Sequence, residues 1–236
     1  NFTINGDKLR TATQWWMETQ RDWEIEKEWL VSAQGVIFAG TSVLRMCCRP
    51  GEGYISSTPV YYRVEEDALR IGRKVVHNPL KLVDGRYRMD FEDLETKMAD
   101  PNNKFYMLCN PHNPIGRVWQ REELAKLAAL ANKYGIIVYS DEIYAENVYN
   151  GNYVTPYAKI PGAERHCIIG TSIGKAFSVT GINFGNIVIP DPELRKRFVQ
   201  QRNRDHYGSI NPFTHAAFLA AHTEEGADWL REMNSY

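Results

Sequence analysis

One lysine of the sequence stands where a buried strand is expected to end. Lys175 follows the apolar run 167–169 by a short turn, so its amine is expected near the carboxyl end of a strand. A lone lysine in such a place is usually a solvated surface charge. In a partly desolvated pocket, however, a lysine has a lowered pKa, and its neutral amine can form a Schiff base with a carbonyl compound. The polar residues upstream decide between these two interpretations.

Two earlier segments also place polar side chains at the ends of predicted strands. Asp141 follows the apolar run 136–139, and Asn113 lies in a proline-bracketed loop after the run 105–108. A buried carboxylate is costly unless it has a partner, and the N–H of a pyridine ring is a suitable one. A protonated pyridine nitrogen also keeps the ring of pyridoxal phosphate an electron sink. Together with the lysine, these residues predict a site for pyridoxal 5'-phosphate.

Three further side chains could complete such a site, although each also has a plain structural explanation. Tyr144 could place its phenol beside the ring oxygen, and Ser172, three residues before the lysine, could share the phosphate. Tyr61, which follows a Thr-Pro pair, could stack on the ring or simply pack against the helix behind it. His112, beside Asn113, is interpreted as a loop residue more readily than as part of the pocket.

The phosphate of the cofactor also needs a group of hydrogen-bond donors. The apolar run 36–39 predicts a short buried strand, and residues 40–43 would then turn into a helix. Thr41, Ser42 and Val43 would aim the backbone amides of this helix start at the phosphate, which is a general way of binding anions. The signal is weak on its own, because many helices begin with Thr or Ser as a cap.

Short apolar runs alternate with amphipathic stretches along most of the chain. Predicted strands lie at 36–39, 54–57, 74–77, 105–108, 136–139, 167–170 and 185–189, and predicted helices at 7–30, 90–99, 121–134, 192–204 and 227–236, with another ending near 69. This order predicts an α/β fold, a three-layer α/β/α arrangement with a mostly parallel sheet. Ligands bind such sheets beyond the carboxyl ends of the strands, where the candidate residues fall. No repeat or linker divides residues 1–236, so one main domain is expected.

The composition excludes several other classes of protein. The chain has 236 residues, and its 28 Lys and Arg nearly balance its 29 Asp and Glu, which argues against a nucleic-acid partner. Four cysteines without CxxC spacing favour buried free thiols and a cytoplasmic location. No apolar run approaches the ~18 residues that cross a membrane, and the motifs of metal, P-loop and GxSxG sites are absent. The chain lacks an initial methionine, as expected of a fragment.

The ordered set Asn113, Asp141, Tyr144, Ser172 and Lys175 resembles the class I/II aminotransferase superfamily of pyridoxal phosphate enzymes, fold type I. Within this superfamily, the stretches 109–119 and 140–143 are similar to the cystathionine β-lyase branch of the MalY/PatB type. The resemblance covers nearly the whole chain. It implies the large, cofactor-binding domain of such an enzyme, with the small domain largely absent, and a homodimer as the assembly.

The resemblance also implies a role for each candidate residue. Lys175 would form the Schiff base with the cofactor and move the substrate's α-proton, while Asp141 would pair with the pyridine nitrogen. The remaining cofactor contacts would come from Asn113 and Tyr144 on the ring oxygen, Tyr61 on the ring face, and Thr41, Ser42, Val43 and Ser172 on the phosphate. The implied reaction is the cleavage of a small amino-acid substrate, cystathionine or a related L-cysteine S-conjugate, to a thiol, pyruvate and ammonia.

Three positions depart from the family pattern and leave alternatives open. Asn183 stands where many superfamily members have an arginine, which favours a lyase, whereas Tyr144 replaces a histidine common in the lyase branch. Phe2 stands where the family usually has a tyrosine. An aminotransferase of the same fold and a catalytically silent regulatory homologue therefore stay open. The arginine that clamps the substrate carboxylate in this family is expected outside the chain.

Overall fold

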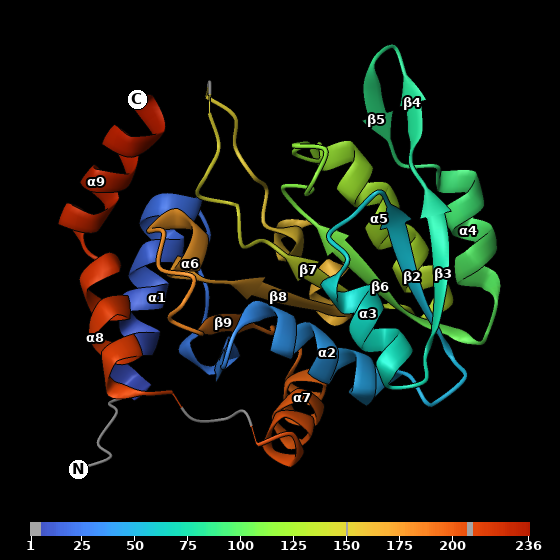
Figure 1. Ribbon diagram of the computed structural model, residues 1–236, viewed down its shortest axis with the longest axis horizontal. Coiled ribbons are helices and arrows are strands. Elements are labelled where there is room, and N and C mark those ends of the chain that lie inside the picture. Colours follow the sequence, from blue (N-terminus) through green and yellow to red (C-terminus); the bar gives the residue numbers. More distant parts are fainter. Residues whose placement is uncertain (1–5, 150, 207–209) are drawn as a thin grey trace.

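A seven-stranded sheet forms the centre of the molecule in the computed structural model, which describes residues 6–149, 151–206 and 210–236 (Figure 1). The strands are β1 (Leu30–Ala33), β2 (Gly53–Thr58), β3 (Lys74–Pro79), β6 (Asn103–Cys109), β7 (Ile137–Asp141), β8 (Cys167–Thr171) and β9 (Gly185–Val188). Their order is β1-β9-β8-β7-β6-β2-β3. Strands β3, β2, β6, β7 and β8 pair in parallel, and β9 is antiparallel to both of its neighbours. The predicted mostly parallel sheet is confirmed.

Helices cover both faces of the sheet, each over its own apolar core. The first core contains side chains of α4 (Phe91–Ala99) and α5 (Arg121–Tyr134), and the second those of α2 (Val36–Cys47), α3 (Arg63–Arg70) and α7 (Pro192–Arg204). Successive residues of a strand enter opposite cores: Val138 packs in the first and Tyr139 in the second. The three-layer α/β/α arrangement predicted from the sequence is therefore confirmed.

A further group of helices lies past the carboxyl end of β8 (Figure 1). It consists of α1 (Gly6–Arg21), the short α6 (Ile173–Ala176), α8 (Pro212–Ala221) and α9 (Glu224–Ser235). Leu9, Ile173 and Phe218 share one small apolar cluster, and Trp16, Ala176 and Leu230 share another. Because α6 packs in both clusters, the helices at the two ends of the chain support the segment that carries Lys175.

Two predicted elements were wrong near the start of the chain. The run 36–39 forms the first turn of α2 instead of a strand, because Gly35 has φ 114°, a conformation open mainly to glycine, and turns the chain from β1 into the helix. The helix predicted over 7–30 ends at Arg21, and Asp22 follows with φ 42°. Phe2 lies outside the described residues.

Most later elements match their predictions closely. Helix α5 has the predicted bounds, and α7 begins as predicted, with the Asp191 side chain accepting a hydrogen bond from the Leu194 amide at 2.7 Å. The sequence did not indicate α8 or the hairpin formed by β4 (Lys81–Val83) and β5 (Arg86–Arg88), which projects from the body of the molecule (Figure 1).

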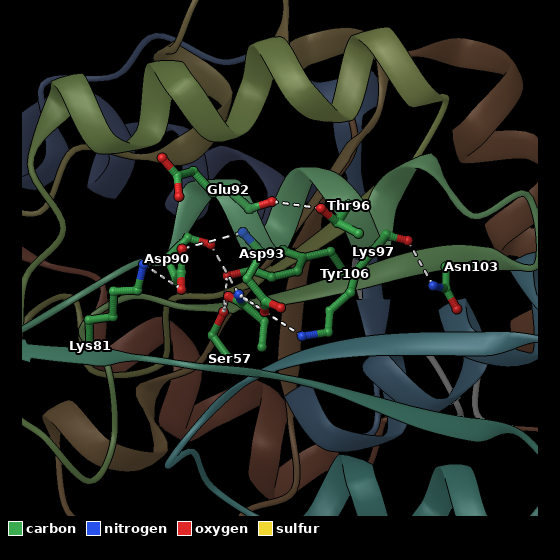
Figure 2. Close-up of polar contacts among 10 residues, drawn as sticks. Ser57, Lys81, Asp90, Glu92, Asp93, Thr96, Lys97, Asn103 and Tyr106 are labelled. Carbon is green, nitrogen blue, oxygen red and sulfur yellow. Dashed lines mark hydrogen bonds and ion pairs between the residues drawn. The ribbon is translucent and has the colours of Figure 1, made fainter.

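A polar network ties the sheet to α4 (Figure 2). The Ser57 hydroxyl lies 2.8 Å from both Asn78 Oδ1 and the Tyr106 hydroxyl, and these three side chains are buried. The Asn78 amide donates to Asp93 Oδ2 at 2.7 Å, and Asp93 forms an ion pair with Lys97. Each polar group of this network finds its partner within the chain, so the network links β2, β3 and β6 to the helix.

The cysteines and the helices also bear on the class of protein. All four cysteines are free thiols, as predicted, and three of them are buried. Among the described helices, none combines the length and the apolar character that a membrane crossing requires. Within the same described residues, no group of three or more His, Cys, Asp and Glu side chains is arranged to hold a metal ion.

Candidate active site

The carboxyl ends of three neighbouring parallel strands bring the candidate residues together. Cys109 at the end of β6 pairs with Asp141 at the end of β7, which in turn pairs with Gly170 of β8. The loop after β6 carries Asn113, and the turn after β8 leads into α6 and Lys175. The sheet therefore gathers at one edge side chains that are up to 62 residues apart in the chain, from 113 to 175.

Asp141 is a buried carboxylic acid with little internal compensation. Its side chain is 5% exposed, and Oδ1 accepts a hydrogen bond from the Ile143 amide at 3.1 Å. Burial raises the pKa of Asp141 to about 7; the Ile143 amide and the Lys175 charge act against this rise, and the Glu142 charge adds to it. The carboxyl group is thus held at the strand end without the strong cationic contact that would keep it ionised.

The next residue, Glu142, is a buried carboxylate whose charge is compensated within the chain. It is fully buried, and Oε2 lies 2.6 Å from Arg21 Nη2. Its other oxygen accepts hydrogen bonds from the Ser140 hydroxyl at 3.0 Å and the Tyr157 amide at 2.9 Å. Glu142 therefore has a structural role, as one half of a buried ion pair with Arg21.

Lys175 lies in the single turn of α6, beside Tyr144. The turn is capped by Ser172, whose Oγ accepts a hydrogen bond from the Gly174 amide at 3.1 Å. The lysine is half-buried, and its Nζ lies 5.5 Å from the centre of the Tyr144 ring, within the range of a cation–π contact. The lysine amine, the phenol and the Asp141 carboxyl group therefore occupy one small region, as the sequence predicted.

A pocket of about 460 Å³ opens beside these residues, lined among others by Pro111, His112, Asn113, Tyr144, Asn147 and Tyr149. His112 forms part of its wall although the sequence favoured a plain loop position. Its Nε2 lies 2.9 Å from the Pro59 carbonyl oxygen, and its ring packs edge-on against Trp119. Burial lowers the pKa of His112 to about 4, so the imidazole is neutral near pH 7 and acts as a wall residue.

The contact between His112 and Pro59 also anchors the loop after β2, which carries Tyr61. The Tyr61 ring is half-buried and lies 5.3 Å from the ring of Tyr62. Stacking of Tyr61 on a cofactor ring stays a prediction.

The predicted phosphate contacts of Thr41, Ser42 and Val43 rest on a helix start that the structure does not have. All three residues lie in the second turn of α2 and are buried. The Thr41 hydroxyl donates to Asp67 at 2.8 Å, the Ser42 hydroxyl donates to Asp205 at 2.6 Å, and Val43 packs in the apolar core. Their hydroxyl groups are thus committed to carboxylates inside the protein, so this part of the predicted site requires correction.

The true N-terminus of α2 lies one turn earlier and borders a second pocket, of about 150 Å³. Gly35, Val36 and Ile37 line this pocket together with Ser172 and Asn183. Backbone amides in the first turn of a helix have no intrahelical acceptor and favour an anion. This position was not predicted because Val36 and Ile37 are β-branched and favour a strand; the glycine directly before them was the available signal.

Comparison with known proteins gives matches over nearly the whole chain. The family model for aminotransferase class I and II matches residues 3–236. Cystathionine β-lyase PatB of Bacillus subtilis is 34% identical over 236 residues, which are 100% of this chain and 61% of PatB. Protein MalY of Escherichia coli is 29% identical over 234 residues, covering 98% of this chain and 58% of MalY. The chain thus spans about three fifths of the length of these relatives.

Solved structures show the same resemblance. Cystalysin from Treponema denticola, which contains a pyridoxal 5'-phosphate cofactor, superposes with a TM-score of 0.94 at 30% identity, over 98% of this chain and 59% of cystalysin. The pyridoxal phosphate-bound C–S lyase from Staphylococcus hominis has a TM-score of 0.90 at 30% identity, over 98% of this chain and 59% of the lyase. The family model and these structures agree with the observed fold, and the chain belongs to the aminotransferase class I and II family.

Proposed function

We propose that the protein is a pyridoxal phosphate-dependent carbon–sulfur β-lyase that cleaves cystathionine or related L-cysteine S-conjugates to a thiol, pyruvate and ammonia. The observation that carries this proposal is the buried Asp141 carboxyl group beside the Lys175 amine at the carboxyl edge of the sheet. The similarity to PatB, named as a cystathionine β-lyase, supports the choice of reaction. In this proposal, residues 1–236 form the large, cofactor-binding domain of the enzyme.

The residues present fit the cofactor. Asp141 is a buried acid whose raised pKa reflects missing compensation, and the N–H of a pyridine ring would supply that compensation. Lys175 provides an amine next to it for the cofactor aldehyde. The first turn of α2, with Gly35, Val36 and Ile37, offers backbone amides for a phosphate, and the Ser172 hydroxyl lines the same pocket.

Each of these side chains has a separate role in the proposed reaction. Bound pyridoxal phosphate supplies an electron sink that lets the substrate lose its α-proton and then its sulfur substituent. The Lys175 amine is the base that takes the α-proton, and Asp141 keeps the pyridine nitrogen protonated. Asn113 and Tyr144 would bond the ring oxygen and so orient the ring in the pocket. Tyr61 is proposed to cover the ring face.

An aminotransferase is the second candidate, because one observation favours it. Tyr144 stands where the lyase branch commonly has histidine and aminotransferases commonly have tyrosine. Human kynurenine–oxoglutarate transaminase 3 is 33% identical over 194 residues, 78% of this chain and 42% of that protein. Both reactions use the same cofactor residues and begin with the loss of the α-proton. A catalytically silent regulatory homologue is the third candidate.

We propose a homodimer as the assembly and the cytoplasm as the location. A homodimer is typical of the family, and size-exclusion chromatography with light scattering on the full-length protein measures it directly. The free thiols agree with a cytoplasmic location, where disulfide bonds are rare.

The products separate these candidates. The full-length enzyme with pyridoxal phosphate is incubated with cystathionine in the absence of any keto acid, and pyruvate and free thiol are measured. A lyase releases both in equal amounts. Turnover that requires a keto acid and yields no pyruvate would identify an aminotransferase, whereas a protein that binds the cofactor without turnover of either kind would be the silent homologue.

A further inference from the structure

Another cavity, of about 550 Å³, adjoins the 460 Å³ pocket beside Tyr144. Gly116, Val118 and Asn152 line both, so a ligand that enters the pocket beside Tyr144, called the first pocket below, can extend into the adjoining cavity. This cavity is also lined by three arginines, Arg86, Arg88 and Arg117, and is called the arginine pocket. Gln120 completes the lining, which contains no acidic side chain among the described residues.

The hairpin β4–β5 holds two of these arginines beside the pocket. Arg86 and Arg88 are alternate residues of β5 and therefore lie on the same face of the strand, whereas Tyr87 between them packs against the apolar core. The Tyr87 carbonyl oxygen accepts a hydrogen bond from Arg117, which lies in the loop that also borders the first pocket. This contact fixes the hairpin, which projects from the body in Figure 1, to the pocket loop.

The charges of the three arginines differ in how they are compensated. Arg117 lies 2.6 Å from Glu123 and 4.6 Å above the Trp119 ring, so its charge is paired and its position fixed. The side chains of the exposed Arg86 and Arg88 have no ion-pair or hydrogen-bond partner among the described residues. The pocket consequently carries two uncompensated positive charges, and an anionic group that reaches them would be attracted.

The position of this charge relative to Lys175 indicates which end of a substrate it meets. Lys175 contacts Tyr144, which lines the first pocket and not the arginine pocket. A substrate whose α-carbon lies near Lys175 would therefore reach Arg86 and Arg88 only with the far end of its sulfur substituent. We propose that the arginine pocket binds a carboxylate at the end of that substituent and so selects L-cysteine S-conjugates with an anionic tail. This assignment rests on the proposed lyase function.

Two nearly isosteric substrates test the proposal on the full-length enzyme with pyridoxal phosphate. S-(2-carboxyethyl)-L-cysteine ends in a carboxylate, and S-(2-carbamoylethyl)-L-cysteine ends in a neutral amide. The parent enzyme is expected to have the higher kcat/KM with the carboxylate. The double substitution Arg86→Gln with Arg88→Gln is expected to lower kcat/KM for the carboxylate about five- to tenfold, because exposed ion pairs are individually weak, and to change it less than about twofold for the amide.

Matched controls separate charge from structure. Arg49 is exposed and precedes the amino end of β2, whereas the β4–β5 hairpin follows the carboxyl end of the parallel strand β3. Arg49→Gln is therefore expected to leave the ratio of the two kcat/KM values unchanged. Arg86→Lys with Arg88→Lys keeps the charge and should retain most of the preference. Raising the salt concentration should reduce the preference of the parent enzyme toward that of the double glutamine variant.

A binding measurement decides the proposal independently of turnover. The probe is 3-(methylthio)propanoate, which carries the anionic tail but no amino acid, with 3-(methylthio)propanamide as its neutral counterpart. Ligand-observed NMR should show tighter binding of the anion to the parent, and no such difference in the double glutamine variant. The proposal for the arginine pocket would be overturned if the anion bound equally well to the parent and to the double glutamine variant, or if the ratio of the two kcat/KM values were unchanged in that variant. Absence of pyruvate from both substrates would instead contradict the lyase proposal, and the binding arm would still decide whether the pocket takes anions.

Discussion

Two polar clusters lie on the same sheet, and they differ in how well their buried groups are compensated by hydrogen bonds and charges within the chain. In the network under α4, Ser57, Asn78 and Asp93 each find a partner inside the chain, and Asn78 lies 2.8 Å from Ser57 and 2.7 Å from Asp93 (Figure 2). At the strand-end site, Asp141 is buried with a hydrogen bond from one backbone amide, and burial raises its pKa to about 7.

This difference separates a structural role from a functional one. A buried polar group that is bonded within the chain contributes to stability or is nearly neutral. A buried carboxyl group without sufficient compensation costs free energy, and such groups cluster at binding and catalytic sites. The neighbour Glu142, held 2.6 Å from Arg21, shows that this protein can compensate a carboxylate at the same strand end. We therefore infer that Asp141 is compensated by the cofactor.

The largest effect is expected from the strand-end site. Lys175→Ala removes the proposed base and the amine that holds the cofactor, so kcat/KM should fall at least about 10⁴-fold. The visible absorbance band of lysine-bound pyridoxal phosphate should disappear as well. Lys126→Ala is the matched control, because Lys126 Nζ lies 5.6 Å from the centre of the Phe91 ring in a similar contact away from the site. Retained turnover in Lys175→Ala would contradict the assignment.

Asp141→Asn should have the next largest effect on activity. The amide keeps the shape and can still accept the Ile143 hydrogen bond, but it carries no charge to keep the ring nitrogen protonated. We expect a loss of about 10²- to 10³-fold in kcat, similar to the loss of other preorganised electrostatic contacts. Steady-state pyruvate release checks this, and an unchanged kcat would show that Asp141 does not face the ring nitrogen.

A substitution in the network under α4 should lower the stability of the protein and leave its turnover unchanged. Asn78→Ala leaves the Ser57 and Asp93 side chains without their shared partner, so the free energy of unfolding should fall by about 1–3 kcal/mol. Activity per folded molecule should stay within about twofold of the parent, because none of these side chains is a candidate cofactor-binding or catalytic residue. Urea unfolding and active-site titration measure the two quantities. A selective loss of kcat at unchanged stability would place this network in the active site.

The smallest effect is expected from the residues that sequence analysis assigned to the phosphate. Thr41→Val removes a hydroxyl that is bonded to Asp67, so the cofactor dissociation constant should change less than about twofold. Ser172→Ala removes a hydroxyl that lines the pocket at the start of α2, and it should weaken cofactor binding about tenfold. Fluorescence titration with pyridoxal phosphate compares the two variants. A larger effect at Thr41 would restore the original assignment.

The contrast also explains which parts of the molecule could be predicted. Asp141 and Lys175 were found because each follows a short apolar run that forms a parallel strand, and the ends of such strands meet. Helix α7 was found from its cap, Asp191. These signals are local in sequence.

Other features depend on contacts between distant segments and left no local signal. Val36 and Ile37 are β-branched and favour a strand by propensity, but they form a helix because Gly35 turns the chain over the sheet. The ion pair between Arg21 and Glu142 joins residues 121 positions apart. The arginine pocket exists because the β4–β5 hairpin is bonded to Arg117, which sequence spacing does not reveal.

The pH dependence of stability tests the central claim most directly. The folded-state pKa of Asp141, about 7, lies above its ordinary value of 3.8, so the folded protein without cofactor binds more protons between these values. Its contribution to stability is therefore lost as pH rises from about 4 to about 7.

Asp141→Asn removes this titration. The free energy of unfolding of the cofactor-free, full-length protein is measured from pH 5 to pH 8.5 for the parent and the variant. The variant should be the more stable at pH 8, by about 2–4 kcal/mol, and the difference should shrink toward pH 5. A variant that is less stable than the parent at pH 8, as Asn78→Ala should be, would contradict the account.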